Sequence, residues 1–188
     1  MIKETIRITK EWIETFVIQL NLCPFAAHPF KNNKIRYIVF EGNTDDLEKF
    51  HALCDKEINF LENTPVSEVE TTLIITPNAF HDFDDYLDEV DFLELGLEEL
   101  FIDADEVPLQ LASFHPDYMF EDTEYSDVEN FTNRSPFPMF HFLRTSRVTI
   151  AIEAHPDIDS VPENNIKKMR ELGFHTVKQM YDDITGTH

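Results

Sequence analysis

Apolar residues recur along this chain with two different spacings, and the alternation between them predicts helices and strands in turn. Spacings of three and four place Trp12 and Phe16 on one side of a helix that Thr9 can cap and that Asn21 can end. The same spacing predicts further helices at 44–64, 83–102 and 162–172. Short β-branched or alternating runs predict strands at 34–40, 71–76 and 107–114.

The segment that follows residue 135 carries both spacings. Ser135 before Pro136 is typical of a helix start, because a hydroxyl cap precedes a proline at the first helical position. Farther along, the apolar residues of 148–152 alternate as they do in a strand. We favour a helix from Ser135 through at least Arg147, with a strand at 148–152 as the alternative.

The order of these elements predicts the class of fold. Three strands that each follow a helix indicate an α/β protein, with α+β as the alternative. We expect one domain over residues 1–188, with a small, largely parallel sheet of three or four strands and about five helices. Residues 115–135 show no period and form a long loop directly after the third strand, where α/β sheets bind ligands.

The charge of the chain is concentrated in one region. No lysine or arginine occurs in the 77 residues from Glu57 to Asn133, which hold 22 of the 37 acidic residues; the remaining 15 acids are balanced by 15 bases. The formal net charge of -22 argues against binding to nucleic acid, whose phosphates would be repelled. The acidic residues either form solvated helix faces or provide a surface for a cation or a basic partner.

The chain has no apolar run of the roughly 18–20 residues that a membrane helix needs, and its first residues lack a signal-peptide core. Cys23 and Cys54 match no metal-ligand spacing and are expected to be free thiols. We therefore expect an acidic cytoplasmic protein with no membrane partner. The sequence indicates neither a cofactor nor an oligomeric state.

Two polar motifs flank the long loop and form the leading candidate site. Arg134 is the first cation after the acidic region, and with Asn133 and Ser135 it offers a fork for a phosphate or carboxylate. The upstream motif, which begins at Ser113, supplies His115 to move a proton, and Asp117 or Asn133 orients the imidazole or the ligand. Alternatively, Arg134 pairs with a carboxylate such as Asp117 or Glu129, and His115 has a structural role.

Other residues extend this site or offer different chemistry. On the helix predicted after residue 135, His141 and Arg144 share a face and can widen an anion pocket. The set Cys23, His115 and Asn133 has the chain order of papain-like thiol proteases, although a thiol after a helix C-terminus has a raised pKa. A metal held by His28, His115 and Asp117 is a further alternative that no ligand spacing supports.

Three motifs together resemble a known family. They read Asn-Leu-Cys-Pro-Phe-Ala at 21–26, Ser-Phe-His-Pro-Asp-Tyr at 113–118 and Thr-Asn-Arg-Ser-Pro-Phe-Pro at 132–138. In this order they resemble the bacterial family catalogued as domain of unknown function 1415, over about 12–173. The resemblance implies a compact bacterial cytosolic domain whose three motifs belong together, but no activity.

Two functions are predicted from these observations. The leading one is an enzyme or binding protein for a small anionic metabolite, with Cys23, His115 and Arg134 lining one concavity and a side-chain hydrogen bond joining the second and third motifs. The alternative is a non-catalytic interaction domain that meets a basic partner through the acidic helix at 83–102. A metal-dependent or thiol hydrolase is the remaining possibility.

Overall fold

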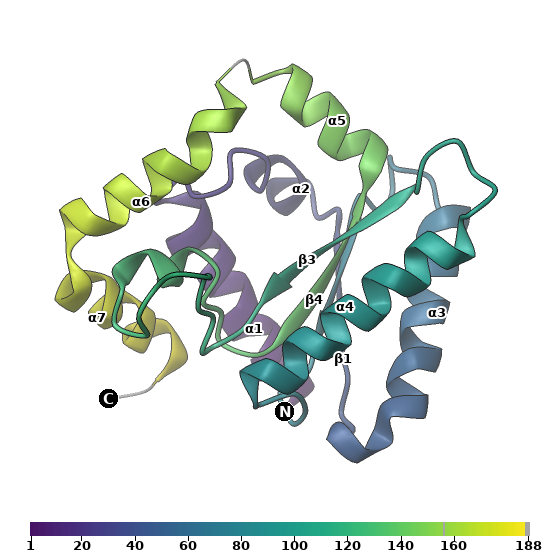
Figure 1. Ribbon diagram of the computed structural model, residues 1–188, viewed down its shortest axis with the longest axis horizontal. Coiled ribbons are helices and arrows are strands. Elements are labelled where there is room, and N and C mark those ends of the chain that lie inside the picture. Colours follow the sequence, from purple (N-terminus) through teal and green to yellow (C-terminus); the bar gives the residue numbers. More distant parts are fainter. Residues whose placement is uncertain (156, 187–188) are drawn as a thin grey trace.

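Four strands form one mixed sheet at the centre of the protein (Figure 1). A computed structural model describes residues 1–155 and 157–186. The strands lie in the order β1-β2-β4-β3, with bounds β1 Ile35–Val39, β2 Thr71–Ile75, β4 Met139–Arg144 and β3 Leu109–Phe114. β1 is parallel to β2, whereas β4 is antiparallel to both β2 and β3. β1, β2 and β3 thus run in one direction and β4 runs against them, so one of the three strand pairs is parallel and two are antiparallel, rather than the sheet being largely parallel. Helices pack on this mixed sheet in the α+β arrangement that was the alternative.

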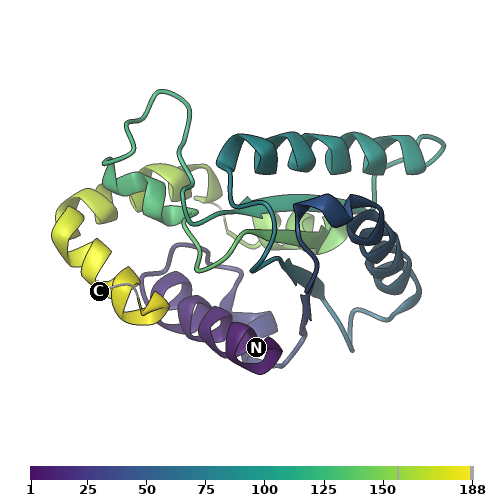
Figure 2. The ribbon, with the colours of Figure 1, turned by 90° about the horizontal axis from the view of Figure 1, so that it is seen from below.

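Helices cover both faces of the sheet, and Figure 2 shows the three layers from the side. On one face, α3 (Leu47–Asn63) and α4 (Phe83–Leu100) bury aromatic and aliphatic side chains against β4. On the other face lie α1 (Ile2–Trp12), the π-helix Ile13–Ile18, α6 (Val161–Leu172) and α7 (Phe174–Thr185). The short helices α2 (Ala27–Lys31) and α5 (Thr145–Glu153) and the 3₁₀ turns Thr44–Asp46, Val128–Thr132 and Ile158–Ser160 complete the fold.

Tyr86 joins the α4 layer to the sheet with a hydroxyl that lies in the interior. The side chain is fully buried, and its hydroxyl donates to the Met139 carbonyl at 2.6 Å. The same oxygen accepts the Phe114 amide at 2.9 Å. One phenol therefore fixes α4, β3 and β4 relative to one another, and its contact on β3, Phe114, lies within the polar motif at 113–118.

The segment after residue 135 differs from the prediction. Residues 139–144 form β4 rather than a helix, because Phe140 and Phe142 enter one core while Met139 enters the other. That alternation suits a strand, and β2 and β3 satisfy the backbone on both sides. The 148–152 run lies in helix α5 rather than a strand; Ile150 and Ile152 stay exposed, so their alternation meets no buried face.

The ends of several other elements also differ. The first helix begins at Ile2, and Thr9 lies buried within it, donating to the Thr5 carbonyl instead of capping. Asn21 has the expected left-handed conformation after the helix, with φ of 51°. The helices predicted at 44–64, 83–102 and 162–172 and all three strands are confirmed. α7 was not predicted.

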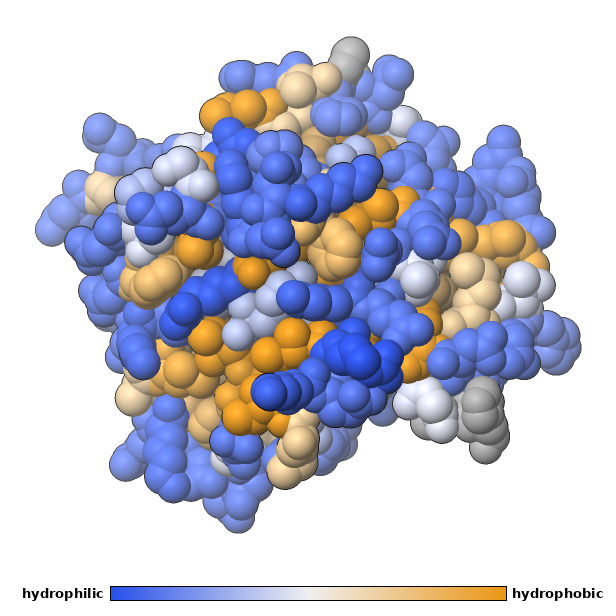
Figure 3. All heavy atoms as spheres, turned by 180° about the vertical axis from the view of Figure 1, so that it is seen from behind, coloured by the Kyte–Doolittle hydropathy of each residue, from blue (hydrophilic) through white to orange (hydrophobic). Residues whose placement is uncertain are grey.

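Among the described residues, no helix has the length and apolar character needed to cross a membrane. Figure 3 shows the side of the molecule that carries α1, where apolar patches alternate with hydrophilic residues.

Candidate functional site

The second and third motifs lie against each other, as the sequence predicts. The His115 amide donates to the Asn133 carbonyl and the Ser135 amide donates to the His115 carbonyl, both at 3.3 Å. The Asn133 side-chain amide also donates to the Ser113 carbonyl at 3.3 Å, which is the expected side-chain hydrogen bond between the motifs. The long loop therefore closes on itself at its two ends.

His115 is held inside this junction with both ring nitrogens engaged. The side chain is fully buried, and Nε2 donates to the Phe80 carbonyl at 2.9 Å. Nδ1 accepts the backbone amide of Asp117 at 3.0 Å, so it is the Asp117 amide and not its carboxylate that meets the ring. Burial lowers the pKa of His115, although the Phe80 carbonyl and nearby Asp117 partly offset this effect. The imidazole is therefore neutral and fully hydrogen-bonded.

Arg134 is equally enclosed. Its side chain lies between two loop carbonyls, with Nε donating to Tyr118 at 3.1 Å and Nη2 donating to Tyr125 at 2.7 Å. The guanidinium carbon lies 4.3 Å from the Tyr125 ring centroid and 4.7 Å from that of Phe131. Burial lowers the pKa of Arg134, partly offset by Tyr125 and Asp117. The residue is 3 % exposed, so its donors face the loop 118–125 rather than solvent.

The carboxylates proposed as partners of Arg134 make other contacts. Asp117 accepts a hydrogen bond from the Tyr125 hydroxyl at 2.9 Å, and Glu129 pairs with Arg170 of α6 at 2.5 Å. Ser135 caps no helix; its hydroxyl donates to the Phe137 carbonyl at 2.6 Å. These contacts hold the loop in place, and a catalytic or ligand-binding role for the motif residues stays a prediction.

Cys23 packs in the apolar core on the α1 side of the sheet. Burial raises the pKa of its thiol, although the backbone amides of Phe25 and Ala26 partly offset the effect. Within the described chain, no hydrogen bond joins Cys23 to His115 or Arg134. The turn that carries Cys23 is instead fixed to α6, since Asn165 donates to the Leu22 carbonyl at 2.7 Å.

His141 and Arg144 do not share a helix face, because both lie on β4 and point to opposite sides of the sheet. His141 donates through Nε2 to the Thr71 hydroxyl at 2.7 Å, and burial lowers the pKa of His141 to about 4. The Arg144 Nη2 donates to the carbonyls of Thr64 at 2.7 Å and Val69 at 3.3 Å. These two residues therefore belong to different environments.

The proposed metal ligands do not come together. Among residues 1–155 and 157–186, no three His, Cys, Asp or Glu side chains gather to hold a metal ion. His28 lies beside Glu70, with 3.3 Å between Nδ1 and Oε2, and not beside His115 or Asp117. The metal set that was an alternative is therefore not assembled among the described residues.

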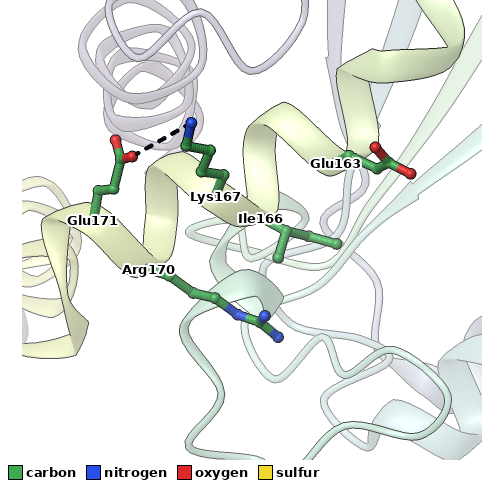
Figure 4. Close-up of a pocket in the computed structure, with 5 residues that line it drawn as sticks. All are labelled: Glu163, Ile166, Lys167, Arg170 and Glu171. Carbon is green, nitrogen blue, oxygen red and sulfur yellow. Dashed lines mark ion pairs between the residues drawn. The ribbon is translucent and has the colours of Figure 1, made fainter.

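Two hollows on the surface lie away from the loop junction. One of about 490 Å³ follows the outer side of α6, where Figure 4 shows the charged side chains spread along one helix face; it is lined by Glu163, Ile166, Lys167, Arg170 and Glu171. The other, of about 230 Å³, lies between the turn at Asn21 and Pro24 and the start of α6. Neither is lined by His115 or Arg134.

A polar cluster that the sequence did not indicate lies where β2 begins and β4 ends. Glu70 is 7 % exposed and accepts the Nε of Arg147 at 2.8 Å, and its other oxygen lies 3.9 Å from the Lys34 Nζ. A single acidic residue before a buried strand carries no spacing signal. Only the folding of distant segments onto one another brings Lys34 and Arg147 to this carboxylate.

The outer side of α4 is both acidic and apolar. Phe92, Leu95 and Leu100 are 56 %, 65 % and 59 % exposed, and Ile102 just after the helix is 77 % exposed. The exposed acidic side chains of the helix are Asp84, Asp85, Asp88, Asp91, Glu94, Glu98 and Glu99. Partial burial and then the like charges of Asp91 and Glu98 raise the pKa of Glu94, as expected on a negative surface. We call this region the α4 surface.

The architecture defines an α+β protein with a mixed four-stranded sheet whose loop motifs are tied to one another. Residues 4–179 match the model of the family described as Protein of unknown function (DUF1415), and the chain belongs to this family. No curated protein and no solved structure matches the chain. The membership agrees with the resemblance of the three motifs and assigns no activity.

Proposed function

We propose that this protein is a non-catalytic interaction domain that binds a basic partner through the α4 surface. The observation that carries the proposal is the exposure of Phe92, Leu95 and Leu100, each more than half exposed, on a helix that contains no cation. Large apolar side chains grouped on an exposed surface are typical of protein interaction sites. α4 forms the outermost layer on its side of the sheet, so a partner has access to it (Figure 2).

Charge selects the kind of partner. Because no lysine or arginine lies between residues 57 and 133, the acidic side chains around the apolar ones have no neighbouring cation in the sequence. A partner with lysine or arginine meets a complementary potential, which accelerates association and excludes acidic competitors. The partner must also bring apolar side chains to cover Phe92 and Leu95.

Gly96 gives the α4 surface a shape. It lies four residues from both Phe92 and Leu100, so the three positions follow one stripe of the helix. A Cβ added to Gly96 would meet no atom within 4 Å, and its backbone is helical, so nothing within the protein requires a glycine there. The result is a notch between two apolar side chains. An amphipathic helix with cations beside its apolar stripe fits such a surface.

The contacts of the loop motifs favour this function over a small-anion site at the same motifs. His115 and Arg134 direct their hydrogen-bonding groups to carbonyls and an amide of the protein itself. An anion would have to displace those contacts, whereas a basic helix would cover apolar side chains that are exposed already.

The test uses a synthetic helical peptide of 18 residues, the length of α4, with leucines and lysines at helical spacing. We expect saturable binding by fluorescence anisotropy that weakens between about 0.1 M and 1 M salt, as the Debye length falls from about 10 Å to about 3 Å. The double variant Phe92→Ser with Leu95→Ser should weaken binding about tenfold or more, because each exposed apolar side chain contributes roughly 1 kcal/mol when covered.

The matched control is Ile150→Ser, which removes a side chain of 51 % exposure from α5. It should leave the affinity unchanged. Equal affinity of the double variant and the wild type, or affinity independent of salt, would contradict the proposal.

A further inference from the structure

We propose that the end of the sheet where β2 begins and β4 ends binds a small oxyanion, a carboxylate or a phosphate, that also carries a hydrogen-bond donor. Four buried side-chain nitrogen or oxygen atoms lack a hydrogen-bond partner among the described residues, and three of them belong to this end: Glu70 Oε2, Thr72 Oγ1 and Arg144 Nε. The strand register places all three residues at one end of the sheet, because Thr72 pairs with Phe142 and Thr71 with Leu143, and Glu70 and Arg144 are the next residues along the two strands.

Burial gives these atoms their significance. Thr72 is fully buried and Glu70 is 7 % exposed, so bulk water does not reach their free atoms. Folded proteins satisfy nearly all buried polar groups, and a group left unsatisfied commonly marks a bound water, an ion or a functional site. Three such atoms at the same end of two adjacent strands are better explained by one ligand that bonds to all of them than by three unrelated unsatisfied groups.

The charge at this end of the sheet favours an anion. Lys34, Arg144 and Arg147 lie around the single carboxylate of Glu70, so cations are in excess. The neighbouring pair of Arg36 and Glu57, joined at 2.7 Å, is neutral as a unit. This local excess of positive charge contrasts with the chain's formal net charge of -22.

Donors and acceptors define the ligand class. Arg144 offers its free Nε–H and Thr72 its hydroxyl, which both suit an oxyanion. Arg147 gives only its Nε to Glu70, and within the described residues its two terminal nitrogens make no hydrogen bond. Glu70 Oε2 lies within ion-pair distance of His28 at 3.3 Å and of Lys34 at 3.9 Å but accepts no hydrogen bond from the described residues, so it can receive an O–H or N–H from the ligand. A hydroxy acid or a singly protonated phosphate has both features.

This site is independent of the α4 surface. It lies where β4 runs directly into α5 (Figure 1), and its test involves no peptide. Failure of one proposal therefore leaves the other unaffected.

Two-dimensional NMR titrations with inorganic phosphate and, separately, with lactate test the inference, each against sodium chloride of equal ionic strength. Saturable shifts should appear at the amides of residues 70–72 and 142–145 with at least one of the two anions. The near-isosteric variant Thr72→Val should weaken that binding at least tenfold, while Thr149→Val, which removes a hydroxyl bonded to the Thr145 carbonyl on α5, should not.

A second variant, Arg147→Gln, should also weaken binding, and it keeps the test valid if Thr72→Val alters the sheet. The inference is overturned if neither anion produces saturable shifts at this end of the sheet. Equal affinity in Thr72→Val, Arg147→Gln and the wild type would overturn it as well.

Discussion

Replacement of Arg134 by methionine distinguishes a structural arginine from a ligand-binding one. Methionine keeps an apolar stem of similar length and removes the charge and all donors. The variant leaves the Tyr118 and Tyr125 carbonyls without their donor and removes the guanidinium from two aromatic faces. A buried acceptor that loses its partner costs about 1–3 kcal/mol, and each ring contact contributes about 0.5–1 kcal/mol.

Part of this loss is recovered, because removing a buried charge also removes its desolvation penalty and because water can enter a loosened loop. The net decrease in the free energy of unfolding should be about 3 kcal/mol, since the recovered part offsets one or two of the individual contributions. For a domain of this size, that decrease lowers the melting temperature by roughly 6–12 °C.

Calorimetry and urea unfolding measure the change, and hydrogen exchange locates it. Amides of residues 115–127 should exchange faster in Arg134→Met, because this loop loses its anchor. Arg7→Met is the matched control; among the described residues Arg7 makes ion pairs only with exposed Glu4 and Glu11, so the substitution should leave the melting temperature unchanged. An Arg134→Met protein as stable as the wild type would refute the structural role and restore the anion site at the motifs.

Three further predictions follow from buried groups and from α4. Tyr86→Phe should lower the free energy of unfolding by about 2–4 kcal/mol in urea titration, because it strips a β3 amide and a β4 carbonyl of their partner; Tyr37→Phe, which breaks no hydrogen bond in the described chain, should be near neutral. His141 has a pKa of about 4 in the folded state and 6.5 ordinarily, so below pH 6.5 the unfolded chain takes up a proton that the folded chain does not. The free energy of unfolding should therefore fall by up to about 3 kcal/mol between pH 6.5 and pH 4. In His141→Gln this part of the pH dependence should disappear, and an unchanged profile would count against the assignment. Gly96→Ala should raise the free energy of unfolding by about 0.5–1 kcal/mol and lower the affinity for the basic peptide. A melting temperature below that of the wild type would contradict the open space around this position.

The elements that sequence predicts well are those with local signals. The strand at 71–76 combines β-branched residues with flanking prolines, and α4 begins with an aspartate cap, Asp82, that accepts two backbone amides. β4 was missed because its length and composition suit a helix as well as a strand. It forms a strand because β2 and β3 both supply backbone hydrogen-bond partners on its two sides. α7 was missed because Gly173, with φ of 79°, ends one helix and directly begins the next.

The motifs at 113–118 and 132–138 were correctly predicted to meet, since both are polar and flank one loop. Their burial was not predictable, because a histidine and an arginine look the same in sequence whether their partners are ligands or backbone carbonyls. The polar cluster at the end of the sheet could not be predicted from the sequence for a different reason. Glu70 and Arg144 are separated by 74 residues, and only the antiparallel register brings them together.

The position of β4 has a consequence for the order in which the protein folds. Among the described strands β3 pairs with β4 alone, although β3 is made first during synthesis. Until residues 139–144 leave the ribosome, the nascent chain holds a two-stranded parallel ribbon with an open apolar edge and an undocked third strand. Closing the sheet requires contacts between residues about 70 apart, which slows folding relative to a protein with local pairing. We therefore expect a truncated chain that stops before β4 to expose β2 and to aggregate.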